Sequence, residues 1–422
     1  MIQNPLARAI GLGTLGMALC LPLSAQAAFI EDSKASLELR NFYMNKDFRH
    51  DSATQSKQDE WAQGFLLRYE SGFTEGTVGV GLDLYGFAGY KLDSGGGTSG
   101  TGLLLPKNHK GKVPSSYGEA GGAVKFKLSE TILRAGTLMP KLPTVSSGDS
   151  RLLPQTFTGV HLNSKEIKNL TVDAGRLNRV NQRNSTHREA IPSNRAGENF
   201  RTNAGKSSEF DFAGLSYVWG ESGLRTSYNY ANLQDVYKQS ILNGVYTFKI
   251  DDKQSLTTDL RYAKTSEDGK SKLDNKAFSG MVTYRLGHSS FSAAYQKMSG
   301  KTGYVYLAGT DPFLTNYVQV RDFGSKDEKS WQARYTYDFA GLGIPGLTFM
   351  TRYISGDNID RGANKSRGKA WERDTDIAYA FQDGPLKNLS VRWRNATVRS
   401  HADVSGDIDE NRLIVSYTIP LL

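Results

Sequence analysis

The chain has 422 residues, with 52 Lys plus Arg against 43 Asp plus Glu and a formal net charge of +9. Its single cysteine excludes a disulfide scaffold, and its basic residues do not gather into the run expected of a nucleic-acid-binding protein. The mean hydropathy is −0.47, and after the N-terminal segment no apolar stretch is long enough for a membrane-spanning helix.

The first 27 residues predict a secretory signal peptide. Arg8 supplies the positive start, 9–23 is an apolar run, and Ala25-Gln26-Ala27 is a small-residue cleavage site. Cys20 lies inside the segment to be removed, so the mature chain is expected to have no thiol and to keep a charge of +8, one less than the whole chain. We therefore predict a signal peptide at 1–27 and one domain at 28–422.

The rest of the chain is built of stretches in which apolar and polar side chains alternate, as in 335–339, 391–394 and 413–417. Alternation alone fits a soluble sandwich or a membrane barrel. Export favours the barrel, an all-β fold with an oily outer face and a polar lumen. Eighteen strands are expected, at 34–44, 60–72, 76–91, 117–129, 130–139, 153–164, 167–178, 208–220, 222–232, 235–250, 253–266, 275–287, 288–299, 328–340, 346–355, 370–382, 386–400 and 408–420.

Short turns and longer loops alternate as the connections between these strands. The expected short turns, rich in Gly, Pro, Asp and Ser, lie at 73–75, 129–130, 164–166, 220–222, 251–252, 287, 340–345 and 383–385. The longer segments lie at 92–116, 140–152, 179–207, 300–327 and 356–369. Segment 179–207 has few large apolar residues, so we expect it to fold into a wet lumen and narrow it. The pattern places both termini in the periplasm.

Several motifs resemble the OprD family of substrate-specific outer-membrane porins, over essentially the whole mature chain. The longest is Asp149-Ser150-Arg151-Leu152-Leu153-Pro154-Gln155-Thr156-Phe157. The others lie at 29–33, 37–43, 136–140, 174–176, 311–316, 328–331 and 412–415. The chain ends in Leu422, whereas outer-membrane barrels usually end in Phe.

This resemblance implies a transmembrane 18-stranded antiparallel β-barrel whose third, fourth and seventh outer loops fold into the lumen. It also implies passive uptake of small carboxylate-bearing solutes along a ladder of basic residues. The relatively short chain resembles the carboxylate-preferring branch more than the branch for basic amino acids.

The alternation of apolar and polar side chains independently predicts the same ladder of basic residues in the lumen. Where Val391 and Trp393 face lipid, Arg392 and Arg394 face the lumen, and the same rule turns many other basic side chains inward. The expected solute-guiding residues on strands are Arg392, Arg394, Arg412, Arg352, Arg334, Arg40, Arg285, Lys125 and Lys127. Arg151, Ser150 and Asp311 are expected in the loops of the constriction. Some of these arginines are expected only to neutralise Glu38, Glu70, Asp259 or Asp338, and Glu372, Asp374 and Asp376 are expected to interrupt the wall and pair with neighbours.

Other functions remain open at this point. A porin for basic amino acids or short peptides would use acidic loop residues such as Asp311 and Glu198. A barrel with serine-hydrolase activity has little support, because the chain has no G-x-S-x-G elbow. A filled, non-conducting barrel would need far fewer strands. His109, His161, His187, His288 and His401 lie far apart, so no metal and no cofactor is expected.

We therefore expect a Gram-negative outer-membrane channel, not an enzyme, that takes up small carboxylates such as benzoate or vanillate. Its partners would be these solutes, outer-membrane lipid and lipopolysaccharide, and the barrel would be a monomer or a loose homotrimer.

Overall fold

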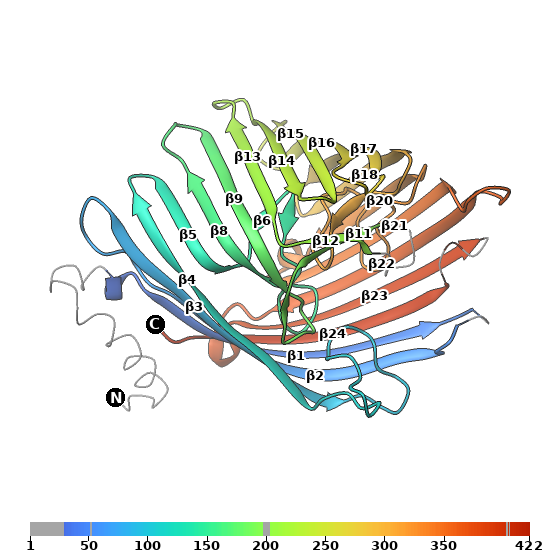
Figure 1. The fold of residues 1–422 in the computed structure, drawn as a ribbon, viewed down its shortest axis with the longest axis horizontal. Helices are drawn as coiled ribbons and strands as arrows, with labels where there is room; N and C mark the ends of the chain where they lie inside the picture. The colour runs from blue at the N-terminus through green and yellow to red at the C-terminus, as the bar shows by residue number, and fades with distance from the viewer. Residues whose placement is uncertain (1–28, 51–52, 197–202, 402–403, 405) are drawn as a thin grey trace.

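The computed structural model describes residues 29–422 apart from 51–52, 197–202, 402–403 and 405, so the predicted signal peptide lies outside the described residues. Among the residues described, eighteen long strands form one closed antiparallel barrel (Figure 1). They are β1 (Lys34–Phe48), β2 (Lys57–Glu70), β3 (Gly79–Asp93), β4 (Ser116–Leu128), β5 (Thr131–Leu138), β8 (Thr156–Ser164), β9 (Leu170–Asn181), β13 (Phe210–Val218), β14 (Leu224–Leu233), β15 (Tyr237–Lys249), β16 (Gln254–Glu267), β17 (Asp274–Leu286), β18 (Ser289–Gly300), β20 (Lys329–Asp338), β21 (Leu347–Ile359), β22 (Gly368–Ala380), β23 (Leu389–His401) and β24 (Ile408–Pro420).

The first and last strands close the barrel. β1 pairs antiparallel with β24 in a continuous register from Ser36 opposite Pro420 to Phe48 opposite Ile408. Closure leaves no unpaired strand edge, which a bilayer would not tolerate. The predicted fold class and the eighteen predicted strands are thereby confirmed, including β24, whose bounds match the expected 408–420.

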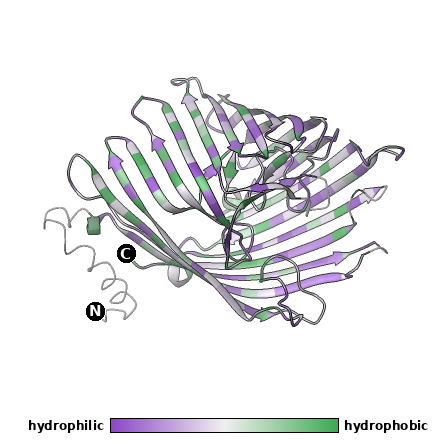
Figure 2. Ribbon diagram, in the orientation of Figure 1, coloured by the Kyte–Doolittle hydropathy of each residue, from purple (hydrophilic) through white to green (hydrophobic). Residues whose placement is uncertain are grey.

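Alternation sorts the side chains as expected. In β18, Phe291, Ala293 and Tyr295 are exposed on the outer face, whereas Ser292 and Gln296 are buried on the lumen side. Bands of apolar and polar residues therefore follow one another along the strands in Figure 2. Buried polar and exposed apolar side chains are the arrangement of a barrel in lipid.

Short turns join the strands at one end of the barrel, and the long loops lie at the other end, where β14 and β15 are nevertheless joined by residues 234–236 alone. The turn between β17 and β18 uses Gly287 at φ 57°, a left-handed conformation that glycine adopts without strain. The 3-10 helices η1 (Phe339–Leu342) and η2 (Gly384–Leu386) fill two further short turns. Within the part of the chain described, no helix is long and apolar enough to cross a bilayer.

The long loops fold inward and pair with one another. The third loop (139–155) contains the hairpin of β6 (Lys141–Leu142) and β7 (Val145–Ser146). The fourth loop (182–209) contains β10 (Arg188–Glu189), β11 (Ile191–Arg195) and β12 (Asn203–Ser207), and the seventh (301–328) contains β19 (Val305–Leu307). Because β11 pairs with both β12 and β19, the fourth and seventh loops form one small sheet inside the barrel (Figure 1).

The second loop (94–115) also contributes to the interior, which the sequence did not indicate. Leu103 and Leu104 are buried in one apolar cluster with Leu152 and Leu153 of the third loop. Glu60 of β2 accepts hydrogen bonds from the backbone N–H of Gly100 and Thr101 and from the Thr101 hydroxyl. This buried carboxylate ties the second loop to the barrel wall.

Candidate functional site

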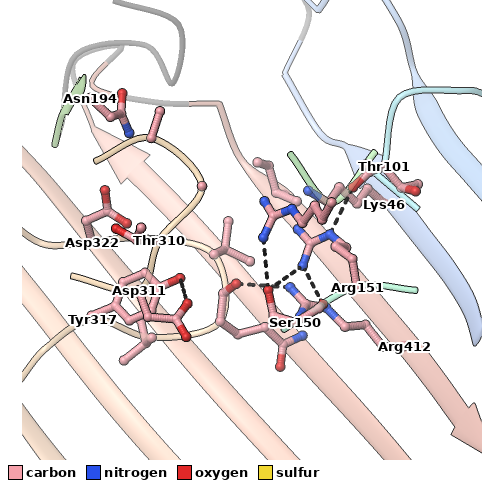
Figure 3. A pocket seen from close by; sticks show the side chains of 18 of the residues that line it. Lys46, Thr101, Ser150, Arg151, Asn194, Thr310, Asp311, Tyr317, Asp322 and Arg412 are labelled. Atoms are coloured by element: carbon pink, nitrogen blue, oxygen red, sulfur yellow. Dashed lines mark hydrogen bonds between the residues drawn. The ribbon is translucent and has the colours of Figure 1, made fainter. Parts of the chain in front are cut away.

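A cavity of about 870 Å³ lies between the inward loops and one side of the barrel. Six basic side chains line it: Lys46, Arg151, Arg183, Arg352, Arg394 and Arg412. In Figure 3, Ser150, Arg151 and Arg412 lie on one side, and Asp311, Tyr317 and Asp322 of the seventh loop lie on the other. A solute in this cavity therefore meets a basic wall and an acidic, tyrosine-bearing loop.

Strand register builds the basic wall. Arg394 of β23 lies directly opposite Arg412 of β24, and Arg334 of β20 lies opposite Arg352 of β21. β22 interrupts the wall with acidic residues, and Arg352 Nη2 of β21 is 2.6 Å from Asp374 Oδ2 of β22. Arg394 Nε is 3.0 Å from Asp376 Oδ2 but is not aligned for a hydrogen bond. Arg394 is thus ion-paired with Asp376 through a buried Nε, and the residue also lines the cavity.

Two loop arginines extend this wall. Arg151 donates through Nε to the Thr101 carbonyl at 3.1 Å, and Arg183 donates through Nη1 to Ser150 Oγ at 3.2 Å. Burial, followed by the positive charges of Arg412 and Arg183, lowers the pKa of Arg151 well below its usual value. Guanidinium groups nevertheless stay protonated in proteins. Arg412 is paired with Glu410 at 2.6 Å, whereas Arg151 and Arg183 form no salt bridge in the described chain, and an entering anion would relieve the repulsion between them.

The seventh loop supplies the opposite side. Tyr317 Oη donates to Asp311 Oδ1 at 3.1 Å, and Tyr306 Oη donates to Asp322 Oδ2 at 2.7 Å. Burial raises the pKa of Asp311 and raises that of Asp322 to about 6. The negative charge on this side consequently depends on pH near neutrality.

Buried carboxylates on the strands hold the seventh loop in place. Glu372 of β22 accepts hydrogen bonds from the backbone N–H groups of Val320 and Arg321, both at 2.8 Å. Glu410 of β24 accepts from the Gln319 amide at 3.1 Å. Both carboxylates have 0% exposed surface. The expected pairing of acidic residues with arginines is thus confirmed for Asp374 and Asp376, but Glu372 instead binds loop backbone.

The structure brings together only part of the predicted site. Six of the twelve predicted residues line the central cavity: Arg394, Arg412, Arg352, Arg151, Ser150 and Asp311. Arg392 lies next to them on β23 and donates three hydrogen bonds to Asp376.

The other predicted residues lie elsewhere. Arg40 is buried and binds Glu38 and Asp149, both carboxylates, so it docks the third loop. Lys125 pairs with Asp83 at 2.6 Å. Lys127 lies beside Phe73, and Arg285 contacts the Asp252 carbonyl, both near the short turns. Arg334 bonds Ser292 Oγ at 3.2 Å. The acidic residue Glu198, named for the alternative solute, lies outside the described residues.

Sequence reasoning missed Arg183, Lys46, Tyr317 and Asp322 as lining residues. Arg40, Phe42 and Met44 are buried positions on the inward face of β1, and Lys46 is the next position on that face. The alternation in the sequence could therefore have predicted that Lys46 faces the lumen. Arg183 lies in the polar segment that was expected to enter the lumen. Tyr317 and Asp322 carried no local signal, because their position depends on contacts between loops far apart in the sequence.

A closed barrel of eighteen strands with a polar, loop-narrowed lumen is the architecture of a porin. The comparisons with known proteins agree. The family model of the outer membrane porin, OprD family, matches residues 27–421. Porin D of Pseudomonas aeruginosa is 40% identical over 421 residues, covering 93% of this chain and 92% of its own length. The chain belongs to the OprD family.

Solved structures show the same relationship. The crystal structure of Pseudomonas aeruginosa OpdQ is 54% identical, with a TM-score of 0.84, and the match covers 94% of this chain and 100% of that one. The crystal structure of Pseudomonas aeruginosa OpdK with vanillate is 37% identical, with a TM-score of 0.85, covering 93% and 100%. The protein is therefore a porin of the Gram-negative outer membrane, in a family of channels rather than enzymes.

Proposed function

We propose that this porin takes up small monocarboxylates passively, with aromatic acids such as benzoate and vanillate as the favoured class. The observation that carries the proposal is the convergence of Arg151, Arg183, Arg394 and Arg412 on one cavity. A guanidinium presents two parallel donors that match a carboxylate. The cavity is also large enough for one aromatic acid with water around it.

The arrangement suits passage as well as binding. Arg352 and Arg392 continue the wall along β21 and β23, and each also bonds a strand carboxylate. Because Asp374 and Asp376 partly neutralise these arginines, each arginine should bind a carboxylate with moderate affinity. A row of such sites conducts a solute better than a single tight site, which would release it slowly. The relative OpdK was solved with vanillate, which supports the same class of solute here.

A second candidate is the uptake of basic amino acids. Asp311 and Asp322 face the arginines across the cavity, so a solute with both charges would find a partner for each. Lys46, Arg352, Arg394 and Arg412 are already paired with Glu410, Asp374 or Asp376 of the strands. Arg151 and Arg183 also line the cavity and form no salt bridge in the described chain, which favours the anionic solute. Serine-hydrolase activity has no comparable support.

Single-channel recording separates the two candidates. The purified protein is reconstituted in a planar bilayer, and benzoate and then arginine are added on one side. We expect brief current interruptions with benzoate and none with arginine at the same concentration. Interruptions with arginine alone would replace the monocarboxylate proposal with uptake of basic amino acids.

A further inference from the structure

The outer face of the barrel carries a row of lysines at the end where the long loops lie. Lys264, Lys276, Lys297 and Lys329 come from β16, β17, β18 and β20, four strands that pair in that order. All four are exposed, and the residues beside them that are buried, such as Ala263 and Ala277, face inward. These four side chains, here called the lysine row, therefore point away from the lumen.

Register places the lysines close to one another. Lys264 lies directly opposite Lys276, and Lys297 lies directly opposite Lys329. Lys276 lies opposite Ser299, which puts Lys297 on the adjacent diagonal. Directly opposed residues have Cβ atoms about 5 Å apart, and like charges at such positions destabilise a sheet. The row thus concentrates repulsion in a small area.

In the described part of the chain no salt bridge neutralises the row, although the exposed Asp357 of β21 lies directly opposite Lys329. None of its four lysines forms a salt bridge there, whereas Lys238 on the neighbouring β15 pairs with Asp268 at 2.9 Å. Elsewhere on the same rim, Asp47 and Asp409 lie opposite each other on β1 and β24, and Arg49 and Arg399 compensate them. Lys264, Lys276 and Lys297 face no carboxylate on the strands paired with theirs, so uncompensated positive charge is a local property of this part of the lysine row.

Aromatic side chains fix the depth of the row in the membrane. Tyr262, Phe278, Tyr295 and Trp331 are 38%, 48%, 46% and 49% exposed. Each lies two residues from one lysine on the same outer face, one step toward the middle of the barrel. Exposed aromatic residues form the girdle at the interface of an outer-membrane barrel. The ammonium groups just beyond this girdle lie at the level of the lipid headgroups, where lysines extend toward charge.

We propose that the lysine row binds the phosphate groups of lipid A, the acylated and phosphorylated disaccharide that anchors lipopolysaccharide in the outer leaflet. Charge complementarity supports this proposal, because none of the four ammonium groups forms a salt bridge in the described chain, three of them face no carboxylate in register, and phosphate is the anionic group available at that depth. Each ammonium is a compact point charge on a flexible stem, which suits a phosphate of variable position. The apolar girdle below would pack against the acyl chains.

Native mass spectrometry of the detergent-solubilised barrel can test this. The test variant combines K264A, K276A, K297A and K329A. The control variant combines K107A, K110A, K112A and K365A, which removes the same charge from exposed loop residues. Three lipids are added in turn: diphosphorylated lipid A, the same lipid after removal of both phosphates, and phosphatidylglycerol.

We expect the wild-type protein and the control to bind diphosphorylated lipid A equally, and the test variant to bind it at least about tenfold more weakly. The dephosphorylated lipid should bind all three proteins weakly. Equal lipid A binding by test variant and wild type would overturn the proposal. So would equal binding of phosphorylated and dephosphorylated lipid, or tighter binding of phosphatidylglycerol than of lipid A. A heat-shift gel, in which a folded barrel migrates differently from an unfolded one, verifies that the test variant is folded.

Discussion

The basic wall of the lumen and the lysine row of the outer rim are built from the same sheet by the same alternation of side chains. They differ in whether their positive charges form salt bridges. In the lumen, Arg352 and Arg392 are held by Asp374 and Asp376 on β22. On the outer face, Lys264 and Lys276 lie opposite each other with no salt bridge in the described chain. Arginines that are held in place by carboxylates can line the solute path through the lumen. Lysines that form no salt bridge can instead bind an anionic group from outside the protein.

The comparison also shows where the pore is defined. Loops are docked on the lumen side by buried carboxylates, and no comparable docking exists for the lysine row among the residues described. The lumen wall is therefore a composite of strand and loop, and its selectivity depends on loop position. The outer rim depends on strands alone.

The largest effect is expected from Glu372→Ala. The substitution leaves the buried N–H groups of Val320 and Arg321 without an acceptor, at a cost of about 2 kcal/mol to the docking of the seventh loop. We expect a larger and noisier single-channel conductance. Glu75→Ala, in an exposed short turn, serves as the control. A conductance that matches this control would show that Glu372 does not hold the loop.

Arg394→Ala is expected to weaken block by benzoate about tenfold, roughly 1.4 kcal/mol. Arg394 lines the cavity, whereas Arg392 is not among its lining residues and donates three hydrogen bonds to Asp376. Arg392→Ala should therefore have the smaller effect, and Arg285→Ala, near a short turn, should have none. The concentration dependence of block measures all three. An equal loss in the two β23 variants would contradict the assignment.

The pore should become more anion-selective in mild acid. Burial raises the pKa of Asp322 to about 6, so this carboxylate is ionised at about pH 7 and mostly protonated at about pH 5. Its loss of negative charge leaves the basic wall less compensated. Reversal potentials in a KCl gradient should shift toward anion permeability as the pH falls. Asp322→Asn should already be shifted at about pH 7 and respond less to pH.

The smallest effect is expected when the lysine row is removed. K264A, K276A, K297A and K329A together should leave conductance and benzoate block unchanged in a bilayer of neutral lipid, because these side chains face away from the lumen. A change in block as large as that of Arg394→Ala would show that the two faces are not independent.

Strand alternation and turn chemistry predicted the barrel well, because both are local properties. The bounds expected for β24 match those observed, and Arg394 and Arg412 face the lumen as alternation requires. Alternation could not show that Arg40 donates a hydrogen bond to Asp149 of the third loop, 109 residues away. Nor could it reveal the pairing of β11 with β19, which places Tyr306 and Asp322. Such contacts join distant segments and leave no periodic pattern in the sequence.

The basic lumen should favour a carboxylate over its counter-ion. The most direct measurement is the reversal potential of the wild-type channel across a planar bilayer with a gradient of sodium benzoate. We expect a potential whose sign shows benzoate to be more permeant than sodium. A potential of the opposite sign, with sodium the more permeant ion, would contradict it.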